Sequence, residues 1–401
     1  MPSRPRAAWP LVAVFGAGHL AAYLLPTVVG RLSSGLGLTP AQAGLVGSAL
    51  LLSSACAGVV IASLTSLTSL TERHGPRRLA RLGLLLALTG YGTAALTSSV
   101  PLVVAGAAVG GLGSGTATAV AAAGIAAQRD PHRVSALGLL AVSATAGALY
   151  LTIPRLGGGH VLPFAALASA AVLVWPATGL LDGSGTRVGV RAAARTRLPR
   201  QRAGAVLAAA MVCWSMAQNA LWGVSGRIGT VQAGLSEVTV GAVFAVGLGA
   251  GLAGVIGAGA LGARLGRAVP IGVGTALIGG CIVVSSSARG LVSFGVGEIL
   301  WNLFYPVVLS YLIGLAASLD PRGRWAVLVG SASSLGVACG PVTGSLLSEH
   351  AGYPGMGLVL CGLLLLVAVP MTAVALGAAP RREITEVALP VRDRAPQALA
   401  S

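Results

Sequence analysis

The chain has 401 residues, of which 55% are hydrophobic and only 9% are charged, and its mean hydropathy is +0.86. Soluble globular proteins carry about 25% charged residues, so this composition excludes a soluble enzyme. We predict an all-α polytopic membrane protein in which nearly the whole chain forms one membrane body.

All 26 basic residues are arginines, and against 10 acidic residues they give a net charge of +16. Such a charge can indicate a nucleic-acid ligand, but here the arginines recur in short polar gaps between apolar runs. Aromatic residues, which would stack on bases, make up only 4% of the chain. We therefore predict a lipid bilayer, and no nucleic acid, as the partner of these arginines.

The residues that would signal a metal or catalytic site are scattered. The five cysteines lie inside apolar runs, without a Cys-x-x-Cys pair or a nearby histidine, at Cys56, Cys213, Cys281, Cys339 and Cys361. Among the five histidines, the nearest approach to a catalytic pair is His132, beside Asp130. A phosphate-binding Gly-x-x-x-x-Gly-Lys loop is excluded because the chain has no lysine. We predict no cofactor, no metal site and no catalytic residue.

Runs of about twenty uncharged residues predict transmembrane helices. In the first half they lie at 10–29, 43–65, 82–99, 102–126, 135–154 and 161–181. In the second half they lie at 205–225, 239–261, 269–287, 291–316, 326–347 and 356–377. Backbone groups in lipid must pair within each run, and the runs are too long for barrel strands. The sequence therefore predicts twelve transmembrane helices.

The arginines orient these spans, because 22 of the 26 lie in alternate gaps. By the positive-inside rule, both termini and the central loop face the cytoplasm. We expect four parts, namely an amino-terminal six-helix bundle (1–181), an Arg-rich central loop (182–203), a carboxy-terminal six-helix bundle (204–378) and a cytoplasmic tail (379–401). The Arg-, Ala- and Gly-rich composition indicates a bacterial genome of high GC content, so we predict a multi-pass protein of the bacterial inner membrane.

The two halves repeat each other at an offset near 196 residues. The motif Val-Val-Gly-Arg-Leu around Arg31 matches Val-Ser-Gly-Arg-Ile around Arg227. Shortly after each motif, Thr39 and Ser236 offer hydroxyl groups as helix N-caps. Six spans per half give both halves the same orientation, so we predict two pseudo-symmetric six-helix bundles with a cavity between them near the bilayer midplane.

Several motifs resemble those of the major facilitator superfamily. Two polar loops are similar to the family's Gly-x-Leu-x-Asp-Arg-x-Gly-Arg-Arg, with matches at Arg73, Gly75, Arg77, Arg78, and again at Gly259, Leu261, Arg264, Gly266, Arg267. The eleventh span, from Gly336 to Gly344, is similar to the family's Gly-x-x-x-Gly-Pro-x-x-Gly. The chain departs from the family with Glu72 in place of Asp and with Ala107 where many proton-coupled members have Arg. The resemblance implies the twelve-helix family fold and secondary transport by alternating access.

Carboxylates beside arginines at helix ends can form contacts that break when a cavity opens. We predict a cytoplasmic gate from Glu72, Arg73, Gly75, Arg77, Arg78, Asp130, Arg264, Gly266 and Arg267. The alternative is that these arginines only fix the topology. Glycines at spacing four, Gly336, Gly340 and Gly344, predict close helix packing, and Pro341 is a candidate hinge.

Glu298 is the one charged residue inside the predicted spans. It lies about 10 Å below the outer interface at 1.5 Å per residue, where an unpaired carboxylate is costly. Asn302 and Tyr305 share its helix face. We predict a carboxylate that binds substrate or exchanges protons, and the alternative is a purely structural hydrogen bond.

Polar and aromatic side chains at helical spacing on spans one and seven are further candidates for the cavity. They are His19, Tyr23, Trp214, Gln218, Asn219 and Trp222. The offset of 196 aligns Tyr23 with Asn219, so two pseudo-symmetric faces would line one cavity. Arg31 and Arg227 occupy equivalent outer positions, either as anion contacts or as anchors at the membrane surface.

Together these features predict a secondary transporter that moves a small organic molecule by alternating access, acts as a monomer and is coupled to protons. Aromatics, amides and one acid suit efflux of an amphipathic, cationic or drug-like compound. The alternative is an organic-anion exchanger or uptake permease that uses Arg31 and Arg227. A polytopic membrane enzyme or sensor is the third hypothesis, but the chain lacks a catalytic constellation for it.

Overall fold

The computed structural model describes residues 8–66, 70–157, 159–181, 198–262, 264–320 and 322–378, and within them it leaves the side chains at 59, 61–66 and 70–74 undescribed. Most of the predicted central loop and all of the predicted tail therefore lie outside the described residues. The first half contains α1 (Trp9–Tyr23), α2 (Leu25–Leu36), α3 (Pro40–Ser66), α4 (Leu70–Leu96), α5 (Val100–Ala126), α6 (Pro131–Leu156), α7 (Val161–Val174) and a 3-10 helix, η1 (Trp175–Leu180). The second half contains α8 (Gln201–Arg227), a π-helix η2 (Ile228–Gln232), α9 (Glu237–Leu261), α10 (Ala268–Ser286), α11 (Leu291–Leu319) and α12 (Arg324–Gly377).

Within the described ranges the number of spans agrees with the sequence prediction. Ten helices are long and apolar enough to cross a membrane, and the bent pair of α1 and α2 forms an eleventh span. α12 has 54 residues, about 80 Å at 1.5 Å per residue, which is enough for two crossings. Gly352, with φ of 68°, breaks α12 between those crossings. The predicted all-α fold with twelve spans is confirmed.

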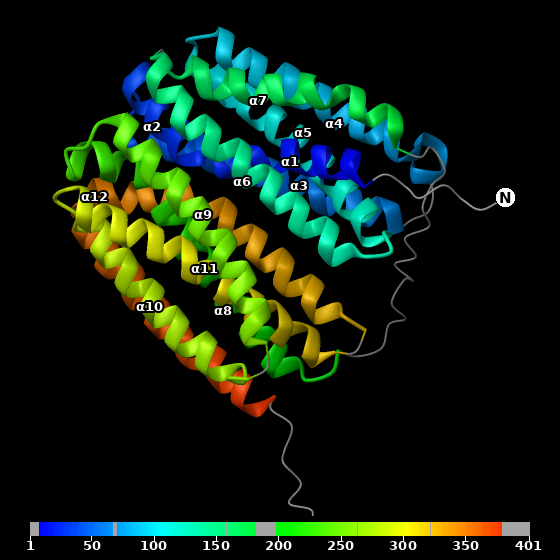
Figure 1. Ribbon diagram of the computed structural model, residues 1–401, viewed down its shortest axis with the longest axis vertical. Helices are drawn as coiled ribbons and strands as arrows, with labels where there is room; N and C mark the ends of the chain where they lie inside the picture. Colours follow the sequence, from blue (N-terminus) through cyan, green and yellow to red (C-terminus); the bar gives the residue numbers. More distant parts are fainter. Residues whose placement is uncertain are drawn as a thin grey trace, which may run out of the picture.

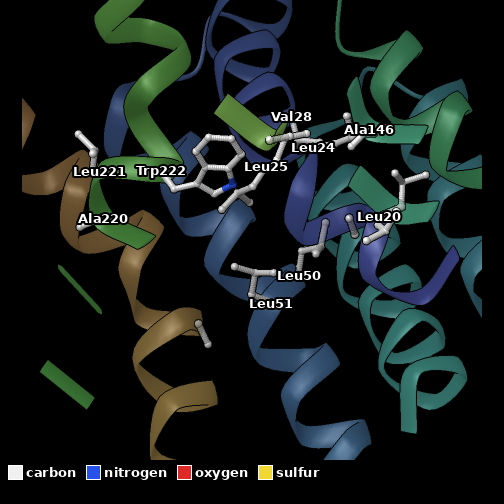
Figure 2. Packing of buried hydrophobic residues seen from close by; sticks show 14 of the residues in the cluster. Leu20, Leu24, Leu25, Val28, Leu50, Leu51, Ala146, Ala220, Leu221 and Trp222 are labelled. Atoms are coloured by element: carbon white, nitrogen blue, oxygen red, sulfur yellow. The ribbon is translucent and has the colours of Figure 1, made fainter. Parts of the chain in front are cut away.

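The helices form two bundles that follow the two halves of the sequence. Figure 1 shows α1 to α7 together in the upper part of the view and α8 to α12 in the lower part. The bundles meet where α2 lies against α8, α3 against α12 and α6 against α9. Apolar side chains fill the junction, and Figure 2 shows Leu25 and Leu50 of the first bundle near Trp222 of the second.

The first span is broken, whereas its repeat partner is continuous. α1 and α2 meet at Leu24 with a bend of 47°. Proline has no backbone N–H, so Pro26 cannot donate to the carbonyl of Ala22, which is four residues earlier. α8 has no proline and runs unbroken through the equivalent region.

The glycines predicted to pack closely face α8. A methyl group added at Gly344 would lie 2.1 Å from the carbonyl oxygen of Ala220, and one added at Gly336 would lie 2.2 Å from that of Val212. Gly340 likewise faces the backbone of Asn219. The break in α12 is at Gly352 and not at Pro341, so the described backbone shows no hinge at the predicted proline.

Both predicted N-caps are present. Ser236 accepts a hydrogen bond from the backbone N–H of Thr239 (3.2 Å), and Thr39 accepts one from that of Gln42 (3.3 Å). These caps start α9 and α3 at one end of the molecule, where α2 also ends. We call this end the Arg31 end.

Candidate functional site

Side chains of α8 and α11 pair in three layers between the two antiparallel helices. Trp214 stacks on Tyr305 with 5.3 Å between ring centroids, the indole of Trp301 donates to the Gln218 side-chain oxygen, and Ser225 donates to Glu298. The Trp222 ring stacks on Trp301 at 5.6 Å and completes the group. We call the set of Trp214, Gln218, Trp222, Ser225, Glu298, Trp301 and Tyr305 the ladder.

Glu298 is completely buried, with 0% of its surface exposed. Its Oε1 atom accepts hydrogen bonds from Ser225 on α8 (2.8 Å) and Ser285 on α10 (2.6 Å). Its Oε2 atom is buried and has no hydrogen-bond partner among the described residues. The sequence predicts a carboxylate that binds substrate or exchanges protons, with a purely structural hydrogen bond as the alternative. Serines on two neighbouring helices enclose the side chain inside the second bundle, and its role stays a prediction.

Two ladder donors are also unpaired. Trp214 and Gln218 are 0% exposed, and the indole Nε1 of Trp214 and the amide Nε2 of Gln218 have no hydrogen-bond partner among the described residues. Buried donors without partners are costly. The ladder therefore carries two donors and one acceptor that a bound solute, water or proton could satisfy.

The other predicted cavity residues are only half-buried. These are His19, Tyr23, Asn219, Asn302 and Tyr305. Tyr23 lies on α1 and Tyr305 on α11, so they come from opposite bundles. His19 is occupied within its own bundle, since its ring nitrogen bonds the Phe15 carbonyl at 3.2 Å and its ring stacks on Phe15 at 4.0 Å. Asn302 donates to the backbone oxygen of Glu298 at 3.0 Å, so its amide does not reach the opposite bundle.

Polar contacts join the two bundles in the half of the molecule nearest the Arg31 end. Arg31 on α2 pairs with Glu237 on α9 at 2.6 Å and also donates to the carbonyl of Gly157 at 2.6 Å. Glu349 of α12 accepts from the backbone N–H of Ala41 at 3.1 Å, and Ser48 of α3 accepts from that of Val342 at 3.0 Å.

The indole of Trp222 also donates across the interface, to the carbonyl oxygen of Ala22, at 3.1 Å. Together with the contacts above, this bond closes the Arg31 end in this structure.

The two candidate anion contacts have different surroundings. Arg31 is only 6% exposed and is fully engaged by Glu237 and backbone carbonyls. Arg227 is half-buried, and its Nη1 atom is buried without a hydrogen-bond partner among the described residues. Neither guanidinium therefore extends freely towards the membrane surface.

The predicted gate residues are not brought together among the described side chains. Arg77, Arg78, Arg264 and Arg267 are exposed, as is Gly266, and Gly75 lies at a kink in α4 with φ of 68°. Asp130 accepts from the backbone N–H of Arg133 at 3.0 Å and so caps its own helix. The side chains of Glu72 and Arg73 lie outside the described residues, so the predicted gate stays a prediction.

Sequence reasoning missed three partners. Ser225 lies seven residues after Gln218 on the same face of α8, a signal that could have predicted it. Glu237 follows the N-cap Ser236, a position that does not indicate a partner in the other half of the chain. Ser285 gives no local signal, because its role depends on where α10 packs. At the end opposite the Arg31 end, Arg81 donates to Thr178 at 3.0 Å, a contact that the sequence did not indicate.

Two six-helix bundles in a membrane, with polar groups where they meet, define the class of multi-pass secondary transporters. The profile of the Major Facilitator Superfamily matches residues 11–321, and the chain belongs to that family. This membership makes it a transporter of a small molecule and not an enzyme.

Comparison with curated proteins finds no match. Among solved structures, the human organic anion transporter MFSD10 (TETRAN) is similar, with 19% identity, a TM-score of 0.63, and coverage of 91% of this chain and 99% of that chain. A mutant of the nucleoside transporter NupG is 10% identical with a TM-score of 0.72, covering 92% of this chain and 99% of that one. The POT family transporter PepTSo is 11% identical with a TM-score of 0.71, covering 94% and 99%. At these identities the likeness concerns the fold alone.

Proposed function

We propose that this transporter exports an amphipathic, positively charged organic molecule in exchange for protons, by alternating access. Two observations support the proposal: a sealed carboxyl group, and an aromatic surface of α8 and α11 beside it. One chain supplies both bundles, so we propose that a monomer performs the full cycle. We also propose that the central loop (182–203) separates the chain into these two bundles.

Glu298 carries the proton in this mechanism. Two hydroxyl groups donate to Oε1, and no cationic side chain lies among the hydrogen-bond or ion-pair partners described for it. A negative charge with one oxygen unpaired is costly in an apolar interior, whereas a neutral acid costs much less to bury. The closed structure therefore favours the protonated acid, and opening of the bundle would let it release the proton to water.

The solute contacts the aromatic face of the ladder and the half-buried residues beside it. Tyr305 and Trp214 offer stacked rings, and a cation is attracted to such ring faces. Asn219 and Tyr23, from opposite bundles, add polar groups that can orient a solute. A molecule with a flat or apolar body and a positive charge satisfies this combination.

The orientation follows from the arginine distribution. Because 22 of the 26 arginines lie in alternate gaps of the sequence, we propose that these gaps face the cytoplasm and that the Arg31 end faces the outside of the cell. In this proposal the ion pair of Arg31 with Glu237 closes the outer side of a protein of the bacterial inner membrane.

Organic-anion transport is the second candidate. The buried, unpaired Nη1 of Arg227 favours it, because a guanidinium binds carboxylates with two parallel hydrogen bonds. The solved structure of an organic anion transporter with this fold is compatible with it. The candidate also requires that Arg31 leave Glu237.

A solute panel in sealed proteoliposomes tests the solute class. The panel contains amphipathic cations and organic anions, and the proteins are wild type, Tyr305→Ala and Arg227→Gln. We expect transport of a cation that falls about five- to thirtyfold in Tyr305→Ala, from lost ring contacts of about 1 to 2 kcal/mol, and persists in Arg227→Gln. Transport of anions alone, abolished by Arg227→Gln, would replace the cation proposal with the second candidate.

A further inference from the structure

We propose that Trp222 couples the ladder to closure of the Arg31 end, by donating its indole N–H to a backbone carbonyl that the opposite bundle leaves free. The inference rests on the proposed alternating access, because it names the residue that links the solute and proton site to closure of the Arg31 end. It assigns Trp222 a positioning role, distinct from direct contact with the solute.

The acceptor exists because of the break in the first span. In a continuous helix the carbonyl of Ala22 would accept from the N–H of residue 26, but Pro26 has none. Ala22 itself is half-buried, and Leu24 and Leu25 beside it are 0% exposed. An unpaired carbonyl in such a place within a membrane span costs free energy. The first bundle therefore presents a half-buried acceptor that needs a donor from elsewhere.

The donor comes from the second bundle. The Nε1 atom of Trp222 lies 3.1 Å from the Ala22 oxygen, and the side chain is 7% exposed. Figure 2 shows the indole pointing from α8 towards the helix that carries Leu25 and Val28. Indole has one donor, so separation of the bundles leaves both the N–H and the carbonyl without this partner.

A neighbouring bond provides an internal contrast. The hydroxyl of Tyr150 on α6 donates to the carbonyl of Tyr23, the next residue at the break. α6 and α1 belong to the same bundle, so this second bond does not depend on the position of one bundle relative to the other. The carbonyl of Ala22 is thus the part of the break that responds to closure.

The same indole is part of the ladder. Its ring stacks on Trp301 with 5.6 Å between centroids and an angle of 24° between planes, and Trp301 bonds Gln218. Glu298 lies one helical turn from Trp301 on α11. A solute or proton that shifts these side chains therefore moves the ring that donates to Ala22, and closure depends on what the ladder has bound.

The test measures the opening of the Arg31 end directly. Spin labels are placed at Leu96→Cys on α4 and Val292→Cys on α11, which are 89% and 80% exposed and lie on opposite bundles, after the five native cysteines are replaced by serine. Distances are measured in lipid nanodiscs for the otherwise unchanged protein, Trp222→Phe and Trp301→Phe. Each variant replaces one indole of the stacked pair Trp222–Trp301 by a smaller phenyl ring and so removes one N–H. Only Trp222→Phe removes a hydrogen bond between the bundles.

We expect Trp222→Phe to raise the ratio of long to short distances about fivefold, as loss of one neutral hydrogen bond implies. Trp301→Phe, which disturbs the ladder but leaves the bond to Ala22 in place, should raise the ratio by a smaller factor. Pro26→Ala restores an N–H that competes for the Ala22 carbonyl, so it should shift the ratio in the same direction, and the double variant Pro26→Ala/Trp222→Phe should open no further than the larger single change.

An unchanged ratio in Trp222→Phe, an equal shift in Trp301→Phe, or additive effects in the double variant would overturn the inference. Pro26→Ala keeps the test decisive if Trp222→Phe does not fold. The distances need no transported solute, so a failure of the proposed transport function is seen separately in the proteoliposomes.

Discussion

Span one and span seven descend from the same repeat position, yet they differ at the point where the bundles meet. Span one is α1 and α2, bent by 47° at Leu24, whereas span seven is the continuous helix α8. At an offset of 196, Pro26 in one half corresponds to Trp222 in the other. One half thus supplies a freed carbonyl and the other supplies its donor. The two halves are therefore asymmetric at this pair of positions.

The arginines that follow these spans diverge in the same way. Arg31 pairs with Glu237 across the interface, while at the repeat offset of 196 Arg227 would face Ala41, which has no carboxylate. The acid that approaches the start of α3 is Glu349, and it accepts from the backbone N–H of Ala41. The difference predicts that equivalent substitutions in the two halves have unequal effects.

The largest contrast is expected between Arg31→Met and Arg227→Met. Removing the Arg31 guanidinium leaves the carbonyls of Gly157 and of the buried Ile153 without their donor, and it removes an ion pair, so we expect a loss of about 2 to 3 kcal/mol in the free energy of unfolding. Glu237 stays half-exposed and can be hydrated. Arg227→Met should cost less than about 1 kcal/mol. Unfolding in mixed detergent measures both, and equal losses would show that the repeat is functionally symmetric.

A second contrast concerns helix packing. α12 packs on α8 with Gly344 against the backbone of α8. In the equivalent place of the first half, α6 packs on α1 with Gly138 facing the Phe15 ring. A methyl group added at Gly138 would lie 2.9 Å from that ring. Gly344→Ala must push two helices apart and should cost about 2 kcal/mol. Gly138→Ala should cost less than about 1 kcal/mol, because the half-buried ring can turn away. Melting temperatures in one detergent compare the two, and a larger loss at Gly138 would contradict this packing account.

The smallest contrast is in pH dependence. A hydrogen bond from Arg324 (2.7 Å) lowers the pKa of Asp320, in the loop before α12. A carboxyl whose folded pKa is depressed stabilises the fold above its unfolded pKa, and this contribution is lost as pH falls through the folded value. Asp320→Asn should therefore lower the melting temperature at neutral pH, and its difference from wild type should begin to shrink as pH falls below about 4.

Asp130, in the equivalent loop of the first half, serves as the control for that titration. It is exposed and accepts only the N–H of Arg133 among its described bonds, and asparagine can cap a helix as well as aspartate can. Asp130→Asn should therefore change the melting temperature little at any pH. A pH-independent effect of Asp320→Asn would show that its bond to Arg324 does not depend on charge.

The spans, the repeat and the glycine contacts could be predicted from the sequence, because apolar runs, offsets and four-residue spacings are local patterns. The break at Leu24 could have been predicted from Pro26 alone, since it removes one helical hydrogen bond. The partners of Glu298 and of Arg31 could not be predicted in this way. Ser285 reaches Glu298 from another helix, α10, and Glu237 is 206 residues away from Arg31 in the sequence. Those contacts depend on how helices pack across the bundle, which no local spacing specifies.

Proton-driven transport by Glu298→Gln tests the central proposal most directly. Glutamine keeps an oxygen that accepts from Ser225 and Ser285 but cannot exchange a proton. With the transported solute identified, we predict that the variant still exchanges labelled for unlabelled solute, yet loses accumulation driven by a pH gradient and the matching proton flux. Glu386→Gln, at an acid of the predicted tail to which the proposal gives no role, should retain both coupled activities. Undiminished gradient-driven accumulation in Glu298→Gln would contradict the proposal that this residue carries the proton.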